Sequence, residues 1–375
     1  MHSVAQSWLV YSMTKSPLYL GLVASLSSLP ILLFTLIGGS VADRYQKRNI
    51  IIITQVLSII PAFALGVLTY GNFVTIWQVG VIAFFFGTVN AFDVPARQSF
   101  LAEIVSKGDI TNAIALNSAA FNGARILGPL MAGLVIANFS IPVCFFINAL
   151  SFVPVVFALT KIKTAGTTKI SNKGFIDTIS EGAQFVVKEK SVLYIMSLIS
   201  VFSLFGIPYI TLLPVLADEV LKEGVRGLSF LVSSAGLGSF AAAMIIAFKG
   251  EVKGKRMYIP VSAIIFSVAI MALALSDDLH IAMLLMFFAG WGIVSFLAVA
   301  NSFIQQVVPD ALRGRVMSLY TLVFLGFAPL GNSAIGFAAH VFGTVVSLRI
   351  FAIICIFSSI IFFILFGKSY KERME

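Results

Sequence analysis

Charged side chains are rare in this sequence, and several of them lie at the ends of long apolar segments. Asp43, Arg44 and Arg48 follow one such segment, and Asp93 and Arg97 close another. Asp93 and Arg97 are four residues apart, so on a helix they share one face. An acid near a membrane boundary normally has a partner. We therefore predict that Asp93 pairs with Arg97, Arg44 or Arg48 in a cluster whose ion pairs break and re-form. The alternative is a static pair at a helix end.

A second group of candidates surrounds Arg125, about a dozen residues into another apolar segment. An arginine at the centre of a membrane helix costs about 2.5–3.5 kcal/mol, so it is expected to face a cavity or a partner. Asn117 and Asn122 can share roughly its face, while Gly128 and Pro129 would permit close packing and a kink. We predict that these residues line a substrate pathway. The alternatives are a buried structural pair for Arg125 and a packing role for Gly128 and Pro129.

No arrangement typical of an enzyme or a metal site occurs in the sequence. It contains no paired nucleophile and base, no zinc-ligand spacing and no phosphate-binding loop. The three histidines, His2, His280 and His340, lie at a terminus or in predicted outer loops. We therefore predict a protein without catalytic residues, metal or organic cofactor, and expect a proton gradient as its energy source.

The composition indicates a protein whose surface faces lipid. Hydrophobic residues make up 59% of the chain and charged residues 11%, against about 25% charged in a soluble domain. The long unbroken apolar runs exclude the alternating strands of a membrane β-barrel. The net charge of +9 resides mainly in short loops, so it does not indicate a nucleic-acid partner.

Eleven apolar segments are long enough to cross a membrane, which takes about 20 residues each. They lie at about 18–42, 49–70, 74–99, 112–137, 141–160, 191–217, 227–248, 257–276, 279–308, 316–340 and 344–367. A twelfth, at 1–14, is too short to span and is interpreted as the end of a first helix whose start is missing.

Loop charges predict the orientation of these segments. Almost all lysines and arginines fall on one side, and the other side holds only Lys15, Lys222 and Arg226. The first side is therefore predicted to be cytoplasmic, together with the C-terminus. Its loops are 43–48, 100–111, 161–190, 249–256, 309–315 and the tail after 367.

The two halves of the chain repeat each other. At an offset of about 203 residues, Phe84, Phe85 and Gly87 fall on Phe287, Phe288 and Gly290, and further matches keep that offset. Six helices per copy make a parallel repeat about an axis along the membrane normal, with a substrate site between the halves near the midplane. We predict an all-α membrane protein of two six-helix bundles. They comprise residues 1–162 and 191–375, joined by a cytoplasmic linker, 163–190, that contains an amphipathic helix at Phe175 to Val187.

The stretch GGSVADRYQKR, residues 38–48, resembles the signature loop of the major facilitator superfamily, G-x-x-x-D-R-x-x-R-R. Gly39, Asp43, Arg44 and the basic pair Lys47-Arg48 occupy its defining positions. In that family the loop locks the two halves together on the cytoplasmic side, and its aspartate caps a helix of the second half. The resemblance therefore implies the major facilitator fold and a cytoplasmic gate. The alternative is a positively charged loop and nothing more.

Three further strings are similar to one branch of that superfamily, the drug–proton antiporters that include enterobactin-exporter-like and macrolide-efflux-like proteins. They are FDVPARQ at 92–98, VAQSWLVY at 4–11 and LRGRVMS at 312–318. This resemblance runs over essentially the whole chain and adds Asp93, Arg97, Arg313 and Arg315 to the gate. The stretch 123–133 is similar to the antiporter motif of exporters, with a longer spacing after its first glycine and Gly133-Leu134 in place of the final double glycine.

These observations predict a secondary transporter that exports an amphipathic small molecule, such as a drug or a siderophore, by rocker-switch alternating access. The alternatives are a metabolite uptake permease and a non-transporting membrane scaffold or sensor. Proton coupling needs a titratable group in the pathway, and Asp93 is the only carboxylate inside a predicted span. We expect a monomer in the bacterial inner membrane, with the substrate and the lipid bilayer as its partners.

Overall fold

The computed structural model describes residues 1–105, 109–162, 175–249 and 254–372. Every regular element in these ranges is helical, which confirms the predicted all-α class. The chain forms two compact units, Met1–Asn172 and Lys173–Glu375. The beginning of the predicted linker, residues 163–174, lies outside the described residues.

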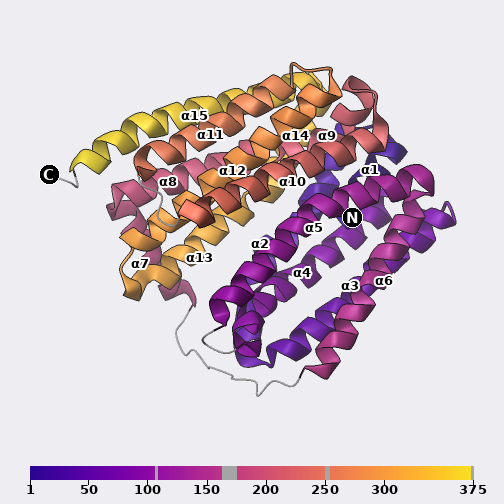
Figure 1. The fold of residues 1–375 in the computed structure, drawn as a ribbon, viewed down its shortest axis with the longest axis horizontal. Coiled ribbons are helices and arrows are strands. Elements are labelled where there is room, and N and C mark those ends of the chain that lie inside the picture. The colour runs from indigo at the N-terminus through magenta and orange to yellow at the C-terminus, as the bar shows by residue number, and fades with distance from the viewer. Residues whose placement is uncertain (106–108, 163–174, 250–253, 373–375) are drawn as a thin grey trace. The chain divides into compact units, whose positions relative to one another are not determined.

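The first unit contains six helices (Figure 1). These are α1 (His2–Thr14), α2 (Pro17–Arg44), α3 (Lys47–Tyr70), α4 (Ile76–Ile104), α5 (Ile110–Asn138) and α6 (Ile141–Lys161). With 13 residues, α1 is as short as the sequence predicts, and the breaks between helices fall at polar or turn-forming residues.

The second unit begins with the predicted amphipathic helix and contains two short π-helical segments, η1 and η2. Its elements are α7 (Phe175–Lys188), α8 (Lys190–Val201), η1 (Phe202–Gly206), α9 (Tyr209–Val215), η2 (Leu216–Val220), α10 (Gly224–Lys249), α11 (Lys255–Leu273), α12 (Leu279–Val307), α13 (Asp310–Gly326), α14 (Ala328–Phe342) and α15 (Thr344–Glu372).

Ten helices in the described part of the chain are long and apolar enough to cross a membrane. The remaining predicted segment, 257–276, corresponds to a shorter apolar helix, Met257–Leu273. Two predicted segments are interrupted helices, since 191–217 becomes α8 to η2 and 316–340 becomes α13 and α14. Sequence hydropathy located these spans but carried no sign of their interruptions.

The two interrupted spans are joined to each other by side-chain hydrogen bonds. Ser203, in η1, donates from Oγ to the carbonyl oxygen of Phe324 at 2.7 Å, near the end of α13. Thr211, in α9, donates to Asn332 Oδ1 of α14 at 3.1 Å. Backbone groups released where a membrane helix is interrupted need partners inside the protein, and Ser203 supplies one to the Phe324 carbonyl from the neighbouring span.

Both units use the same helix pairings. In the first unit α2 packs along α4, and α3 packs along α4 and α6. In the second unit α10 packs along α12, and α11 packs along α12 and α15. Counting α8 to η2 as one span, these are the same ordinal positions in each half. The internal repeat inferred from residue matches therefore has a counterpart in the packing.

Glycines bring the paired helices into backbone contact at equivalent positions. A Cβ built on Gly87 of α4 would overlap the carbonyl oxygen of Ser27 on α2. A Cβ on Gly290 of α12, at the repeat offset of 203, would overlap the carbonyl oxygen of Ala235 on α10. Only glycine permits such an approach, which is how membrane helices gain close packing where lipid offers no hydrophobic drive.

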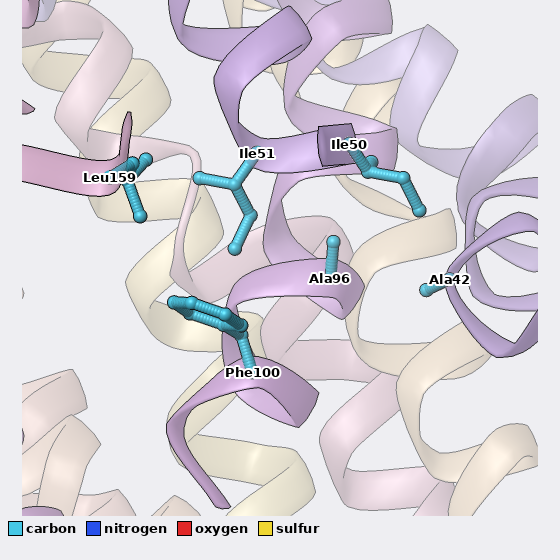
Figure 2. Packing of buried hydrophobic residues seen from close by; sticks show 6 residues of the cluster. All are labelled: Ala42, Ile50, Ile51, Ala96, Phe100 and Leu159. Carbon is cyan, nitrogen blue, oxygen red and sulfur yellow. The ribbon is translucent and has the colours of Figure 1, made fainter. Parts of the chain in front are cut away.

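A buried apolar cluster joins four helices at one end of the first unit (Figure 2). Phe100 and Ala96 of α4 meet Ile50 and Ile51 of α3 there. Ala42 near the end of α2 and Leu159 near the end of α6 complete the cluster. The loop between α2 and α3 and the end of α4 are thereby held against a common core, next to the polar residues considered below.

Replacing Gly87 by alanine tests the backbone contact between α2 and α4. The added methyl group has no room, so we expect Gly87→Ala to lower the free energy of unfolding by about 1–3 kcal/mol. The control is Gly123→Ala, because nothing lies within 4 Å of a Cβ built at that position. Thermal unfolding of the purified protein in detergent measures both. Equal stability of the two variants would contradict the contact.

Candidate functional site

Asp93 is buried near the cytoplasmic end predicted for α4, and three donors surround its carboxylate. Thr54 Oγ1 and Gln55 Nε2, both on α3, donate to Oδ1 at 2.6 and 2.9 Å. The Arg97 guanidinium donates to Oδ2 at 2.5 Å from one turn further along α4. We call these four residues the Asp93 cluster. It joins α3 to α4 through charge-assisted hydrogen bonds, the stronger kind in a low-dielectric setting.

The local sequence explains why α4 approaches α2 closely beside this cluster. Pro95 lies inside α4 and has no N–H, so the carbonyl of Ala91 loses its intrahelical donor. Gly38 of α2 lies against that same carbonyl, since a Cβ built on Gly38 would overlap it. The proline and the two small residues thus create a close contact two residues before Asp93 in α4.

The two cations that follow the loop after α2, Lys47 and Arg48, have different partners. Arg48 donates to the carbonyl oxygens of Leu159 at 2.7 Å and Thr160 at 2.8 Å, where α6 ends. A cation there complements the negative end of the α6 dipole. Lys47 forms an ion pair with Glu103 of α4. Among the three partners predicted for Asp93, the structure therefore selects Arg97.

Asp43 and Arg44 project from the end of α2. Both are exposed, and no ion pair or hydrogen bond of either side chain is recorded within the described ranges. Gly39 precedes them with open space around its Cα, because nothing lies within 4 Å of a Cβ built there. The first part of the signature loop is thus exposed on the surface of its unit, whereas Lys47 and Arg48 are held by an ion pair and by hydrogen bonds.

In the second unit, the two predicted gate arginines stabilise the start of α13. Arg313 pairs with Asp310 at 2.5 Å and donates from Nε to the Gln305 carbonyl at 3.2 Å. Arg315 pairs with Glu181 of α7. Gly182 of α7 packs against the same residue, since a Cβ built on Gly182 would lie 3.2 Å from the Arg315 backbone. Helix α7 is therefore docked on α13 within this unit.

Beside Arg313 lies a polar pocket of about 420 Å³ that the sequence analysis did not anticipate. Its walls come from the last turns of α12 and the start of α13. They are Ala298, Asn301, Ser302, Gln305, Gln306 and Arg313. The available signal was the run of amide residues four and five apart at the end of an apolar segment.

The structure places Arg125 on the surface of its unit, in the middle of the apolar part of α5. The residue is exposed, and no ion pair is recorded for it among the described residues. The structure therefore does not contain the buried structural pair that the sequence left as an alternative for Arg125. Asn117 is also exposed, Asn122 is half-buried, and Pro129 is buried. Gly128 lies against the first residue of the chain, since a Cβ there would be 3.3 Å from Met1 N.

One titratable residue lies where sequence reasoning did not place it. His2 was assigned to a terminus, yet its side chain is buried with 8% of its surface exposed. Its ring stacks on Phe86 of α4 with centroids 4.5 Å apart and lies 5.6 Å from Phe145 of α6. Single-sequence reasoning had no means of placing α1 among α4, α5 and α6.

Comparison with known proteins identifies the family. Residues 1–372 match the family model described as a transmembrane secretion effector. A staphyloferrin A transporter of Staphylococcus aureus is 27% identical over 386 residues, covering 99% of this chain and 93% of that protein. The multidrug efflux pump Tap of Mycolicibacterium fortuitum is 24% identical, covering 88% of this chain and 82% of the pump. Macrolide efflux protein A of Streptococcus pyogenes is 19% identical, covering 85% and 80%.

Solved structures show the same fold at lower sequence identity. The nucleoside transporter NupG superposes with a TM-score of 0.77 at 15% identity, covering 96% of this chain and 93% of that one. An inward-facing bacterial homologue of the human lysosomal transporter Spinster gives 0.75 at 13% identity, covering 98% and 94%. At such identities the likeness extends to the fold alone.

The exposure of the two charges in the Asp93 cluster predicts an asymmetric response to mutation. The Arg97 side chain is 59% exposed and that of Asp93 only 5%. Arg97→Gln strands a buried carboxylate, whereas Asp93→Asn leaves a solvated cation, so we expect Arg97→Gln to cost about 2 kcal/mol more. The double variant should recover most of that loss. Thermal unfolding measures all three, with exposed Arg226→Gln as control. A larger loss in Asp93→Asn would refute the assignment.

Proposed function

Because the chain belongs to the transmembrane secretion effector family of major facilitator transporters, we propose that it exports an amphipathic small molecule in exchange for protons. The chain is an integral membrane transporter and not an enzyme. The proposal concerns the direction of transport, the substrate class and the energy source. A drug or a siderophore is the class we favour.

The export direction and the substrate class are supported by the relatives. Two of them are named for efflux, the multidrug pump Tap and macrolide efflux protein A, and a third for staphyloferrin A transport. Each alignment covers at least 80% of both chains. Relatives with these names favour export over metabolite uptake and over a role as a membrane scaffold.

The mechanism we propose is a rocker switch in which residues 1–162 and 191–375 move as two halves around a central site. The observation that carries it is the Asp93 cluster. Thr54 and Gln55 hold the end of α4 to α3, and Arg97 completes the cluster from α4 itself, so that the two helices can move as one rigid piece. The exposed Asp43 and Arg44 remain available to groups of the second half when the cytoplasmic side closes. The gate that we propose also includes Arg313 and Arg315 at the start of α13, which pair with Asp310 and Glu181 within their own unit.

The substrate pathway we propose includes the exposed face of α5. Arg125, Asn117 and Asn122 lie on that helix, with Gly128 and Pro129 one turn beyond Arg125. A charged side chain exposed in the middle of a membrane span is stable only against water or a polar partner, which favours a water-filled cavity over lipid. Positive loop charge favours a cytoplasmic C-terminus in a bacterial plasma membrane, and we propose a monomer as the working unit.

The proposal is tested by measuring efflux in a bacterial strain that lacks its own exporters. Cells are loaded with ethidium or with members of a panel of drugs and siderophores, with and without a proton uncoupler. We expect accelerated efflux that the uncoupler abolishes, and a loss of about tenfold in Asp43→Asn at normal membrane levels of the protein. The matched control is Asp277→Asn, an exposed acid in another loop. Absence of efflux for the whole panel, or efflux indifferent to the uncoupler, would refute the proposal.

The pathway assignment predicts that Arg125→Ala abolishes export or changes the substrate profile in the same assay. Arg125→Lys keeps the charge without the planar guanidinium, so we expect it to retain part of the activity. The control is Arg226→Ala, which removes an exposed cation at the start of α10. If Arg125→Ala exports the same compounds at the wild-type rate, the arginine does not line the pathway.

A further inference from the structure

An apolar groove lies between α8 and α15 of the second unit, away from the residues considered so far. It has a volume of about 200 Å³. The two helices pack along each other, and each presents one face to the groove, with residues three and four apart. The lining residues are Tyr194, Ser197, Leu198 and Val201 from α8, and Ser358, Ile361, Phe362 and Leu365 from α15.

The groove has a closed floor and an open rim. Phe362 and Leu198 are buried and form the floor. Phe362 stacks on Phe366 with ring centroids 4.8 Å apart, which holds its ring in place. Ile361 and Leu365 form the rim, and Ile361 is 55% exposed whereas its neighbour Phe362 is 4% exposed. A fixed floor below an exposed rim makes a preformed site.

The surface around the rim is apolar as well. Along α15, Phe357, Ile360 and Ile364 are also exposed. Both helices belong to segments long and apolar enough to cross a membrane, Lys190–Val220 and Thr344–Phe366. The groove therefore opens within the apolar part of the two spans, where the chains of lipid molecules are the surrounding solvent.

The two serines of the lining do not make the groove polar. Ser197 Oγ donates to the Leu193 carbonyl at 2.9 Å, and Ser358 Oγ donates to the Cys355 carbonyl at 2.9 Å. Each hydroxyl hydrogen is thus used within its own helix, as is common for serine in a helix. An occupant at this depth needs no polar group, which suits a hydrocarbon chain.

One end of the groove lies at the boundary of both spans, and cations lie there. Tyr194 lines this end, and Lys190, the first residue of α8, precedes it by one turn on the same face. Helical side chains lean toward the N-terminus of their helix, which brings the Tyr194 hydroxyl toward Lys190. Lys188, the last residue of α7, adds a second cation, and both lysines are exposed.

An acid also lies at this mouth, and it already has a partner. The Glu189 carboxylate accepts a hydrogen bond from Ser191 Oγ. On the other helix, the sequence continues past the apolar span with Lys368 and Lys371. Loop charge predicts that this is the cytoplasmic side, where the membrane surface is negative and attracts lysines close to it.

We propose that this groove binds an anionic phospholipid. One acyl chain lies between α8 and α15, and the phosphate lies at the mouth, where Lys190 pairs with it and the Tyr194 hydroxyl donates to it. Lys188 adds attraction at longer range. The apolar lining selects against a free phosphate ion, and the cations select against a neutral lipid. The inference is independent of the proposed export, because lipid can bind at this groove whether or not the chain moves a substrate.

The headgroup is tested by native mass spectrometry of the purified protein in detergent. Dioleoyl phosphatidylglycerol and dioleoyl phosphatidylcholine have the same chains and differ in net charge. We expect the anionic lipid to bind about tenfold more tightly and Lys190→Gln to weaken its binding about fivefold. The control is Lys161→Gln, which removes an exposed lysine at the end of α6. Equal affinity for the two lipids, or an equal loss in the two variants, would overturn the inference.

The acyl chain is tested by filling the groove. Ser197→Trp places an indole ring where the chain would lie, so we expect it to weaken the binding of phosphatidylglycerol. Ser151→Trp adds the same ring at an exposed serine of α6 and should bind the lipid like the wild type. Glycerol phosphate, which has the phosphate without the chains, should not compete. Unchanged binding by Ser197→Trp, or competition by glycerol phosphate, would show that no lipid chain occupies the groove.

Hydrogen exchange of the unmodified protein covers the case in which a variant does not fold. Phosphatidylglycerol should slow backbone exchange in α8 and in residues 358–366 of α15, because an occupied groove opens less often. The same concentration of phosphatidylcholine should leave exchange in both segments unchanged. Protection spread evenly over the chain, or absent from these two segments, would contradict the groove as the site.

Discussion

Helices in a bilayer gain no hydrophobic free energy by leaving lipid for one another, so close backbone contact and a few internal hydrogen bonds must hold them together. This chain meets the requirement with glycines at matching places in its two units. Gly87 lets α4 touch the backbone of α2, and Gly290 lets α12 touch that of α10. In the first unit, α2 ends at Asp43 and Arg44 and α4 carries Asp93 and Arg97, so this contact helps to place charged residues of both helices.

The same requirement explains where the polar groups are. Lipid offers no hydrogen bonds, so buried polar atoms draw their partners from the protein itself, either from a neighbouring helix or from their own. Asp93 is satisfied from α3 and from its own helix, and Ser203 is satisfied from α13. Five buried side-chain atoms among the described residues have no such partner, and they are His2 Nδ1, Thr35 Oγ1, Thr69 Oγ1, Asn148 Nδ2 and Arg349 Nε.

The two units share helix pairings but differ in their charges. The first unit carries the signature loop, with Arg48 bound at the end of α6, and the second carries α7, with Glu181 paired to Arg315. The repeat positions of Asp93 and Arg97 are Phe296 and Ala300, so the second unit has no equivalent of the Asp93 cluster. The two units therefore share a scaffold but carry different sets of ion pairs.

The sequence by itself determined the membrane class, the spans, the internal repeat and the family resemblance, because hydropathy, loop charge and the offset of 203 are properties of the linear chain. It also limited the partners of Asp93 to three arginines, since helical spacing and loop proximity are readable from residue order. Only the tertiary structure showed that Asp93 pairs with Arg97. It also showed that Arg125 is exposed and that two of the spans are interrupted helices. It alone placed His2 between Phe86 and Phe145. These outcomes depend on which helix faces meet, and contacts between helices far apart in sequence leave no periodic trace in a single chain.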